Sequence, residues 1–301
     1  MGVALGLGAA LCWGLADYFA AVASRSVGAL AVVLGFHLVA LVPLTVLVLA
    51  TNALAGVSAA QVGVFALVGA VGWVSYLAFY GALAIGPISV LSPVVSGYAA
   101  VTVLLAVAFA GNRLSGVQAI AVGLTIAGAM LASADIRTIS RVKLQRRAAL
   151  GFVLALCAMG LLGGFVFGVS YYRDQIGWLA PIFLARGFAA GFLLGHVVST
   201  RASGRAAAAG DSGAESAGPR LRRRRLGALI VLLALLDTGG YVFFNLGVGH
   251  AATAIVAAAS APYAVVPIVM GVSLFAERPT RPQWLGVGLV VAGVVVLGAV
   301  S

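Results

Sequence analysis

Ten apolar segments, each about as long as a membrane-spanning helix, occupy most of this chain of 301 residues. A helix needs about 20 residues to cross the hydrocarbon core of a bilayer. The segments are 2–23, 29–50, 62–85, 88–110, 116–134, 149–171, 178–199, 226–247, 251–275 and 282–300. Only 8% of the residues are charged, which is too few to build a water-facing surface. We therefore expect an all-α integral membrane protein with ten transmembrane helices.

The basic residues are concentrated in two connectors, 135–148 and 200–225, and give the chain a net charge of +11. Fifteen of the 18 Lys and Arg residues fall in connectors on one side of the predicted membrane. Cytoplasmic loops beside anionic lipid have this pattern. We expect these connectors in the cytoplasm, both termini outside and the bacterial cytoplasmic membrane as the location. The expected partners are membrane lipids and no nucleic acid. The 200–225 connector has no apolar periodicity and is predicted to be a disordered basic loop.

The chain also repeats itself, because residues 73–130 align with 238–295 without a gap. Matching pairs include Tyr76/Tyr241, Tyr98/Tyr263, Arg113/Arg278 and Gln118/Gln283. We interpret 1–134 and 149–301 as two five-helix repeats joined by the basic linker 135–148. Five is odd, so the second repeat would enter the membrane inverted. Inverted repeats are typical of secondary transporters, whose sites lie at the repeat interface near mid-membrane. A duplicated structural bundle without transport is the alternative.

Two of the seven acidic residues, Asp237 and Asp17, fall inside apolar segments. A charge in mid-bilayer costs roughly 2.5–3.5 kcal/mol on insertion scales, so it usually faces water or a buried partner. We expect Asp237 to bind a proton or a cationic group of the substrate. Asp17 lies further along its segment, so a binding role and a position near the interface remain equally open.

Helical spacing predicts further residues along the transport path. Asp237, Tyr241 and Asn245 recur every fourth residue and share one helix face, and Trp13 and Asp17 have the same spacing. Tyr76 and Tyr80 form a similar stripe in the third segment. Such stripes face protein or water rather than lipid, although ordinary packing between helices explains them as well.

Arg186 is the one basic residue inside an apolar segment. It either forms a buried ion pair with Asp237 or Asp17, or acts as a counter-charge that is released when a substrate carboxylate or a proton arrives. No group of His, Cys, Asp and Glu has the spacing of a metal site, and we expect no metal, no cofactor and no catalytic residue.

Helix-breaking residues stand at related places in the two repeats. Pro93 and Gly97 interrupt the fourth segment, and Pro262 interrupts the ninth at the position equivalent to Gly97. Paired interruptions of this kind indicate a transporter's binding site, because unwound backbone is tolerated where it lines a cavity.

Several short motifs resemble the drug/metabolite transporter superfamily, in its ten-helix EamA group. They are Leu11-Cys12-Trp13-Gly14, Arg186-Gly187-Phe188, the turn at Glu277-Arg278 and Gln283-Trp284-Leu285-Gly286. The first repeat departs from the pattern, since Gly111-Asn112-Arg113 lacks the acidic member of the turn. The resemblance implies export of small metabolites, driven by a gradient and without ATP.

The combined hypothesis is a secondary transporter, not an enzyme, that exports a small metabolite or an amino-acid-like or drug-like compound across the cytoplasmic membrane by alternating access. Protons are the candidate coupling ion, and the protein would act as a monomer or homodimer. A lipid flippase remains an alternative because it would also use a polar bundle interior. An integral-membrane enzyme is the weaker alternative, since the intramembrane acids lie deep and singly.

Overall fold

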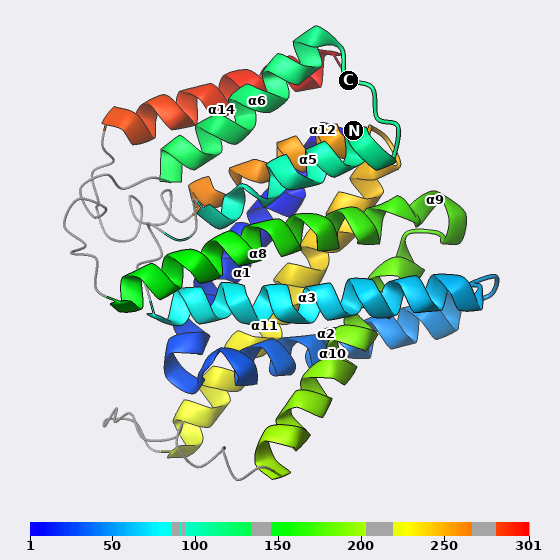
Figure 1. The fold of residues 1–301 in the computed structure, drawn as a ribbon, viewed down its shortest axis with the longest axis vertical. Coiled ribbons are helices and arrows are strands. Elements are labelled where there is room, and N and C mark those ends of the chain that lie inside the picture. Colours follow the sequence, from blue (N-terminus) through cyan, green and yellow to red (C-terminus); the bar gives the residue numbers. More distant parts are fainter. Residues whose placement is uncertain (86–90, 92–93, 134–145, 203–218, 267–280, 301) are drawn as a thin grey trace.

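The computed structural model describes residues 1–85, 91, 94–133, 146–202, 219–266 and 281–300. Every regular element in this part of the chain is a helix (Figure 1). In order these are α1 (Gly2–Val27), α2 (Ala29–Thr51), α3 (Ala59–Ile85), α5 (Tyr98–Phe109), α6 (Gly116–Ser133), α8 (Arg146–Tyr171), α9 (Arg173–Ile176), α10 (Leu179–Ala202), α11 (Pro219–Val248), α12 (Thr253–Ser260), the 3-10 helix η2 (Ala261–Val265) and α14 (Arg281–Val300).

The predicted apolar segments coincide with these helices. Six helices are long and apolar enough to cross a membrane, by length and composition, within the described residues. Four shorter apolar helices, at 94–109, 116–128, 253–263 and 284–297, fall in the other four segments. The first residues of segment 88–110 and the last of segment 251–275 lie outside the described part, as does the turn at Glu277 and Arg278.

The basic connectors are shorter than predicted. Residues 200–202 continue α10, and residues 219–225 already belong to α11. Pro219 suits the first helical position, where its missing N–H is not needed, and arginine has a high helix propensity. Likewise, residues 146–148 of the linker 135–148 form the start of α8. The rest of both connectors, 135–145 and 203–218, lies outside the described residues.

The helices pack side by side into one bundle (Figure 1). Helix α1 packs on α11 and α12, α8 packs on α3 and α5, and α6 pairs with α14. Small residues bring the helix backbones close together, as in membrane bundles generally. At the α6–α14 contact, Gly128 lies against the backbone of Gly286 and Val290, and Gly293 lies against the backbone of Ala121 and Thr125.

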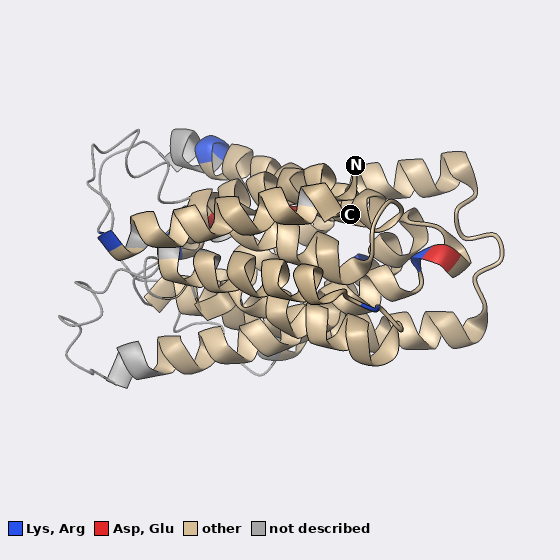
Figure 2. Cartoon of the chain, turned by 90° about the horizontal axis from the view of Figure 1, so that it is seen from above, with Lys and Arg blue, Asp and Glu red and all other residues tan. Residues whose placement is uncertain are grey.

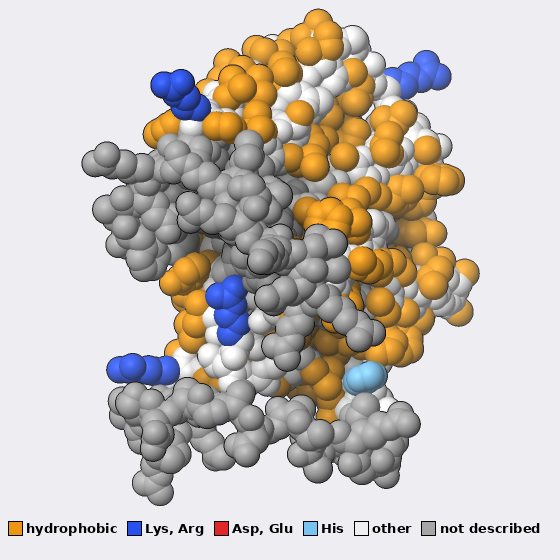
Figure 3. All heavy atoms as spheres, turned by 60° about the vertical axis from the view of Figure 1, so that its left-hand side comes forward, with side chains coloured by type: hydrophobic (Ala, Val, Ile, Leu, Met, Phe, Trp, Pro, Cys, Tyr) orange, Lys and Arg blue, Asp and Glu red, His pale blue; other side chains and the backbone are white. Residues whose placement is uncertain are grey.

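The outer surface is apolar along the helices and charged at their ends. Described Lys, Arg, Asp and Glu residues gather mainly at the two ends of the bundle (Figure 2). Hydrophobic side chains cover much of the described surface on the face in Figure 3. Val42, Leu67 and Leu104 each expose about two thirds of their surface. In water such residues would be costly to expose, whereas in lipid they match their surroundings.

Candidate substrate-binding site

A cavity lies in the middle of the bundle. The space between its wall atoms, counted together with the open space at its mouth, is about 370 Å³. Helices α1, α3, α5, α8, α11 and η2 all contribute to its wall. The lining residues are Trp13, Asp17, Tyr76, Phe79, Tyr98, Leu162, Val166, Asp237, Tyr241 and Tyr263.

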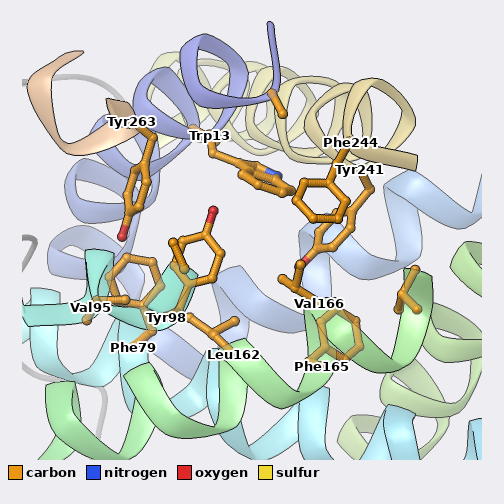
Figure 4. Close-up of a cluster of buried hydrophobic side chains, with 14 of the residues drawn as sticks. Trp13, Phe79, Val95, Tyr98, Leu162, Phe165, Val166, Tyr241, Phe244 and Tyr263 are labelled. Carbon is orange, nitrogen blue, oxygen red and sulfur yellow. The ribbon is translucent and has the colours of Figure 1, made fainter. Parts of the chain in front are cut away.

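Aromatic rings make up much of this wall (Figure 4). The ring centroids of Trp13 and Tyr98 are 6.0 Å apart in an edge-on arrangement, and those of Trp13 and Tyr241 are 5.0 Å apart. Tyr98 and Tyr263 follow at 5.7 Å, with their hydroxyl groups directed toward the space between the helices (Figure 4). These spacings are typical of aromatic pairs with favourable ring electrostatics. Leu162 and Val166 of α8 complete an apolar part of the wall.

Interrupted helices present the two tyrosines Tyr98 and Tyr263. Residues 94–96 are helical, Gly97 is a turn residue, and α5 starts at Tyr98. On the other side of the cavity, α12 changes at Ala261 into the tighter helix η2, which contains Pro262 and Tyr263. Proline removes one backbone donor and is tolerated where a helix begins or changes its winding. Pro93 lies outside the described residues.

Trp13 reaches the cavity because two glycines allow close approach of backbones. A side chain at Gly240 would collide with the Trp13 indole, and one at Gly14 would collide with the backbone of Tyr263. In this position Trp13 Nε1 donates a hydrogen bond to the backbone oxygen of Asp237, at 3.2 Å. Trp13 thus links α1 to the backbone of α11 at Asp237.

The Asp237 carboxylate forms a buried ion pair with Arg186 of α10. Arg186 Nη2 contacts Asp237 Oδ2, and the two residues expose only 1% and 4% of their surface. The Tyr76 hydroxyl donates to the other oxygen, Oδ1, at 3.1 Å and lies 3.1 Å from the Tyr241 hydroxyl. Both carboxylate oxygens of Asp237 therefore have partners, and its negative charge is balanced within the protein.

Aromatic rings surround the rest of the Arg186 side chain. Its guanidinium carbon lies 5.7 Å from the ring centroid of Phe36 and 5.2 Å from that of Tyr241. Such contacts attract a cation to the face of a ring. Its Nε and Nη1 have no hydrogen-bond partner among the described residues. Arg186 does not itself line the cavity and lies behind Asp237.

Asp17 is the second carboxylate on the cavity wall, one helical turn after Trp13. It exposes 7% of its surface. The ion pairs among the described residues are Arg186–Asp237 and Arg173–Asp174, so Asp17 takes part in neither. Its Oδ2 has no hydrogen-bond partner in the described part of the chain. Asp17 thus brings an unbalanced carboxyl group to the cavity.

Besides Arg186, two of the predicted binding residues lie off the cavity wall. Asn245 shares a helix face with Asp237, but eight residues of helix place it about 12 Å further along the axis. It is fully buried there and donates through Nδ2 to the backbone oxygen of Tyr241, at 3.0 Å. Tyr80 is turned toward Phe36, with ring centroids 5.7 Å apart. Equal spacing along a helix identifies a common face but not the depth at which a cavity ends.

Five wall residues were not among the predicted site residues. In the sequence Tyr98 and Tyr263 form a matching pair of the two repeats, and their place directly after the helix interruptions is the signal that could have identified them. Phe79, Leu162 and Val166 are ordinary apolar residues of a membrane segment. Only the packing of the helices shows that these three face the cavity rather than lipid.

Comparisons with known proteins agree with this architecture. Residues 1–134 match the model of the EamA-like transporter family, which confirms the drug/metabolite transporter resemblance predicted from the sequence. No curated protein sequence matches the chain. A solved structure described as "Crystal structure of protein" aligns with a TM-score of 0.71 and 15% sequence identity, covering 99% of this chain and 96% of that chain. At this identity the likeness concerns the fold alone.

Proposed function

Since residues 1–134 match the model of the EamA-like transporter family, we propose that this multi-pass membrane protein is a secondary transporter that exports a small metabolite by alternating access. The proposed architecture is ten transmembrane helices in two inverted repeats, 1–134 and 149–301. In such folds the substrate site lies between the repeats, and the repeats move against each other around it.

The packing of the helices supports the two-repeat architecture. If α1 and α8 are exchanged, and α3 with α11 and α5 with α12, several of the most extensive contacts of the bundle map onto one another. The α1–α11 contact becomes α8–α3, and α1–α12 becomes α8–α5. The close contact of α6 with α14 maps onto itself, with Gly128 and Gly293 at equivalent positions. Helices related by a pseudo-two-fold axis can be exchanged in this way because each contact has an equivalent in the other repeat.

The observation that carries the proposed function is the position of the cavity. Both proposed repeats contribute to its wall, through α1, α3 and α5 of the first and α8, α11 and η2 of the second. A rocking motion of one repeat against the other would therefore change access to this cavity. Its carboxylates and hydroxyls lie in the interior of an otherwise apolar bundle, where polar groups usually serve transport.

The helix ends support the proposed orientation. The end of α1, the start of α8, the end of α10, and the starts of α11 and α14 lie at one end of the bundle, opposite the chain termini (Figure 1). The connectors at that end contain most of the basic residues. We place this end in the cytoplasm and the protein in the cytoplasmic membrane.

A transport assay with a blocked cavity tests the proposed function. Purified protein in liposomes would be offered a labelled panel of amino acids, quaternary ammonium compounds and small organic acids, with and without a pH gradient. Leu162→Trp places a bulky ring in the cavity. Leu156→Trp is the matched control on the same helix, because Leu156 exposes 41% of its surface on the outside of the bundle.

We expect at least one compound to cross faster than in protein-free liposomes. We also expect Leu162→Trp to reduce this rate about tenfold or more, while Leu156→Trp leaves it unchanged. If nothing in the panel crosses, or if Leu162→Trp transports at the normal rate, the proposal is wrong. A fluorescent phospholipid in the same liposomes provides the test for a flippase, and its protein-dependent flipping without metabolite transport would favour that alternative.

A further inference from the structure

The cavity wall has one carboxyl group, that of Asp17, with no cation beside it. Asp237 is balanced by Arg186, whereas Asp17 has no ionic partner among the described residues. None of the described lining residues is Lys, Arg or His. An anionic substrate would therefore enter next to an unbalanced carboxyl group and find no free cation, which disfavours its binding.

The surroundings of Asp17 suit a cation that also has apolar groups. Trp13 lies one turn away on α1, and the rings of Tyr98 and Tyr263 extend the same wall (Figure 4). Aromatic faces attract cations, most strongly where water is excluded. Across the cavity, Phe79, Leu162 and Val166 offer an apolar surface without hydrogen-bonding groups. A hydrated inorganic ion would gain nothing from that surface.

We propose that the substrate is an organic cation, an ammonium compound with an apolar or aromatic body, whose charge binds Asp17 between the rings of Trp13, Tyr98 and Tyr263. This inference rests on the proposed function, because it names the substrate class of the same cavity. Asp237 does not supply the counter-charge, since Arg186 already occupies one of its oxygens and Tyr76 the other.

Three probes of the same shape and different charge test the proposal. They are phenyltrimethylammonium, the neutral 2-phenylpropan-2-ol and the anion benzenesulfonate, each a benzene ring with a tetrahedral head group. Binding to the purified full-length protein in detergent is measured by calorimetry and by quenching of tryptophan fluorescence, to which Trp13 contributes. We expect the cation to bind the wild-type protein at least about tenfold more tightly than the other two.

Variants then locate the counter-charge. Asp17→Asn keeps the shape of the side chain, and we expect it to weaken binding of phenyltrimethylammonium about tenfold or more. Asp17→Glu keeps the charge and should retain most of the affinity. Asp174→Asn is the matched control, because Asp174 is an exposed aspartate of α9 paired with Arg173 outside the cavity.

The proposal is overturned if the neutral or anionic probe binds the wild-type protein as tightly as the cation, if no cation binding is found, or if Asp17→Asn binds normally. The comparison of probes on the wild-type protein stands even if the Asp17→Asn variant fails to fold. Transport of a compound of another class, blocked by Leu162→Trp, would refute the cation proposal and leave the proposed transporter function intact.

Discussion

The surroundings of Asp237 and of Asp17 differ, although both carboxylates line the same cavity. Asp237 has an arginine, a tyrosine hydroxyl and an indole N–H packed around it, and each of its carboxylate oxygens has a partner. Asp17 has aromatic neighbours, and its Oδ2 has no partner in the described part of the chain. The contacts of Asp237 are those of a structural ion pair, whereas the Asp17 carboxyl group is available to bind a ligand.

This difference separates two roles that buried charges have in membrane proteins. A paired charge holds helices together, here α10 and α11, and its loss is costly because one partner is left alone in the interior. A carboxyl group without an ionic partner holds no helices together and is available to a ligand. The comparison therefore predicts that the same Asp→Asn change has a large effect on stability at position 237 and a small one at position 17.

The largest expected effect is that of Asp237→Asn on stability. It leaves the Arg186 guanidinium buried without a counter-charge, and arginine cannot lose its proton in a protein. We expect a loss of roughly 3–5 kcal/mol in the free energy of unfolding. Unfolding in mixed micelles of a mild detergent and dodecyl sulfate measures this loss, and a loss below about 1 kcal/mol would show that the pair is not structural.

Arg186→Gln should cost less, because the carboxyl group left behind can take up a proton and become neutral. The expected loss is about 1–3 kcal/mol, the usual cost of an unsatisfied buried polar group. Combining Arg186→Gln with Asp237→Asn should restore part of the stability lost in Asp237→Asn alone. A loss as large as that of Asp237→Asn would contradict this account of the pair.

The smallest expected effect is that of Asp17→Asn on stability. No hydrogen bond or ion pair of a described residue depends on its Oδ2, so we expect a change of less than about 1 kcal/mol. The same micelle experiment measures it beside Asp237→Asn. A loss as large as that of Asp237→Asn would mean that Asp17 is structural, and the contrast between the two carboxylates would disappear.

Much of the fold was predictable from the sequence, because lipid imposes simple rules on a chain. Apolar length locates the helices, and spacing every fourth residue puts Asp237 and Tyr241 on the face that meets the cavity. The interruptions at Gly97 and Pro262 were also visible, because glycine and proline have local effects on the backbone.

The partner of Arg186 was not predictable in the same way. From the sequence, Asp17 and Asp237 were equally good candidates, since both are intramembrane carboxylates on other helices. The choice depends on how α10 packs against α2 and α3 and how α11 packs against α1, which no local pattern contains. For the same reason the cavity-facing Leu162 could not be distinguished from the outward-facing Leu156 on the same helix.

Access to position 162 from both sides of the membrane tests the central claim, alternating access to this cavity, most directly. Leu162→Cys is made in a chain with Cys12→Ala and Cys157→Ala and treated with a membrane-impermeant trimethylammonium thiol reagent. Leu156→Cys is the control on the outer face of α8. We predict labelling at position 162 both in right-side-out and in inverted vesicles, and slower labelling with phenyltrimethylammonium present. Labelling from one side only, or from neither, would contradict the account.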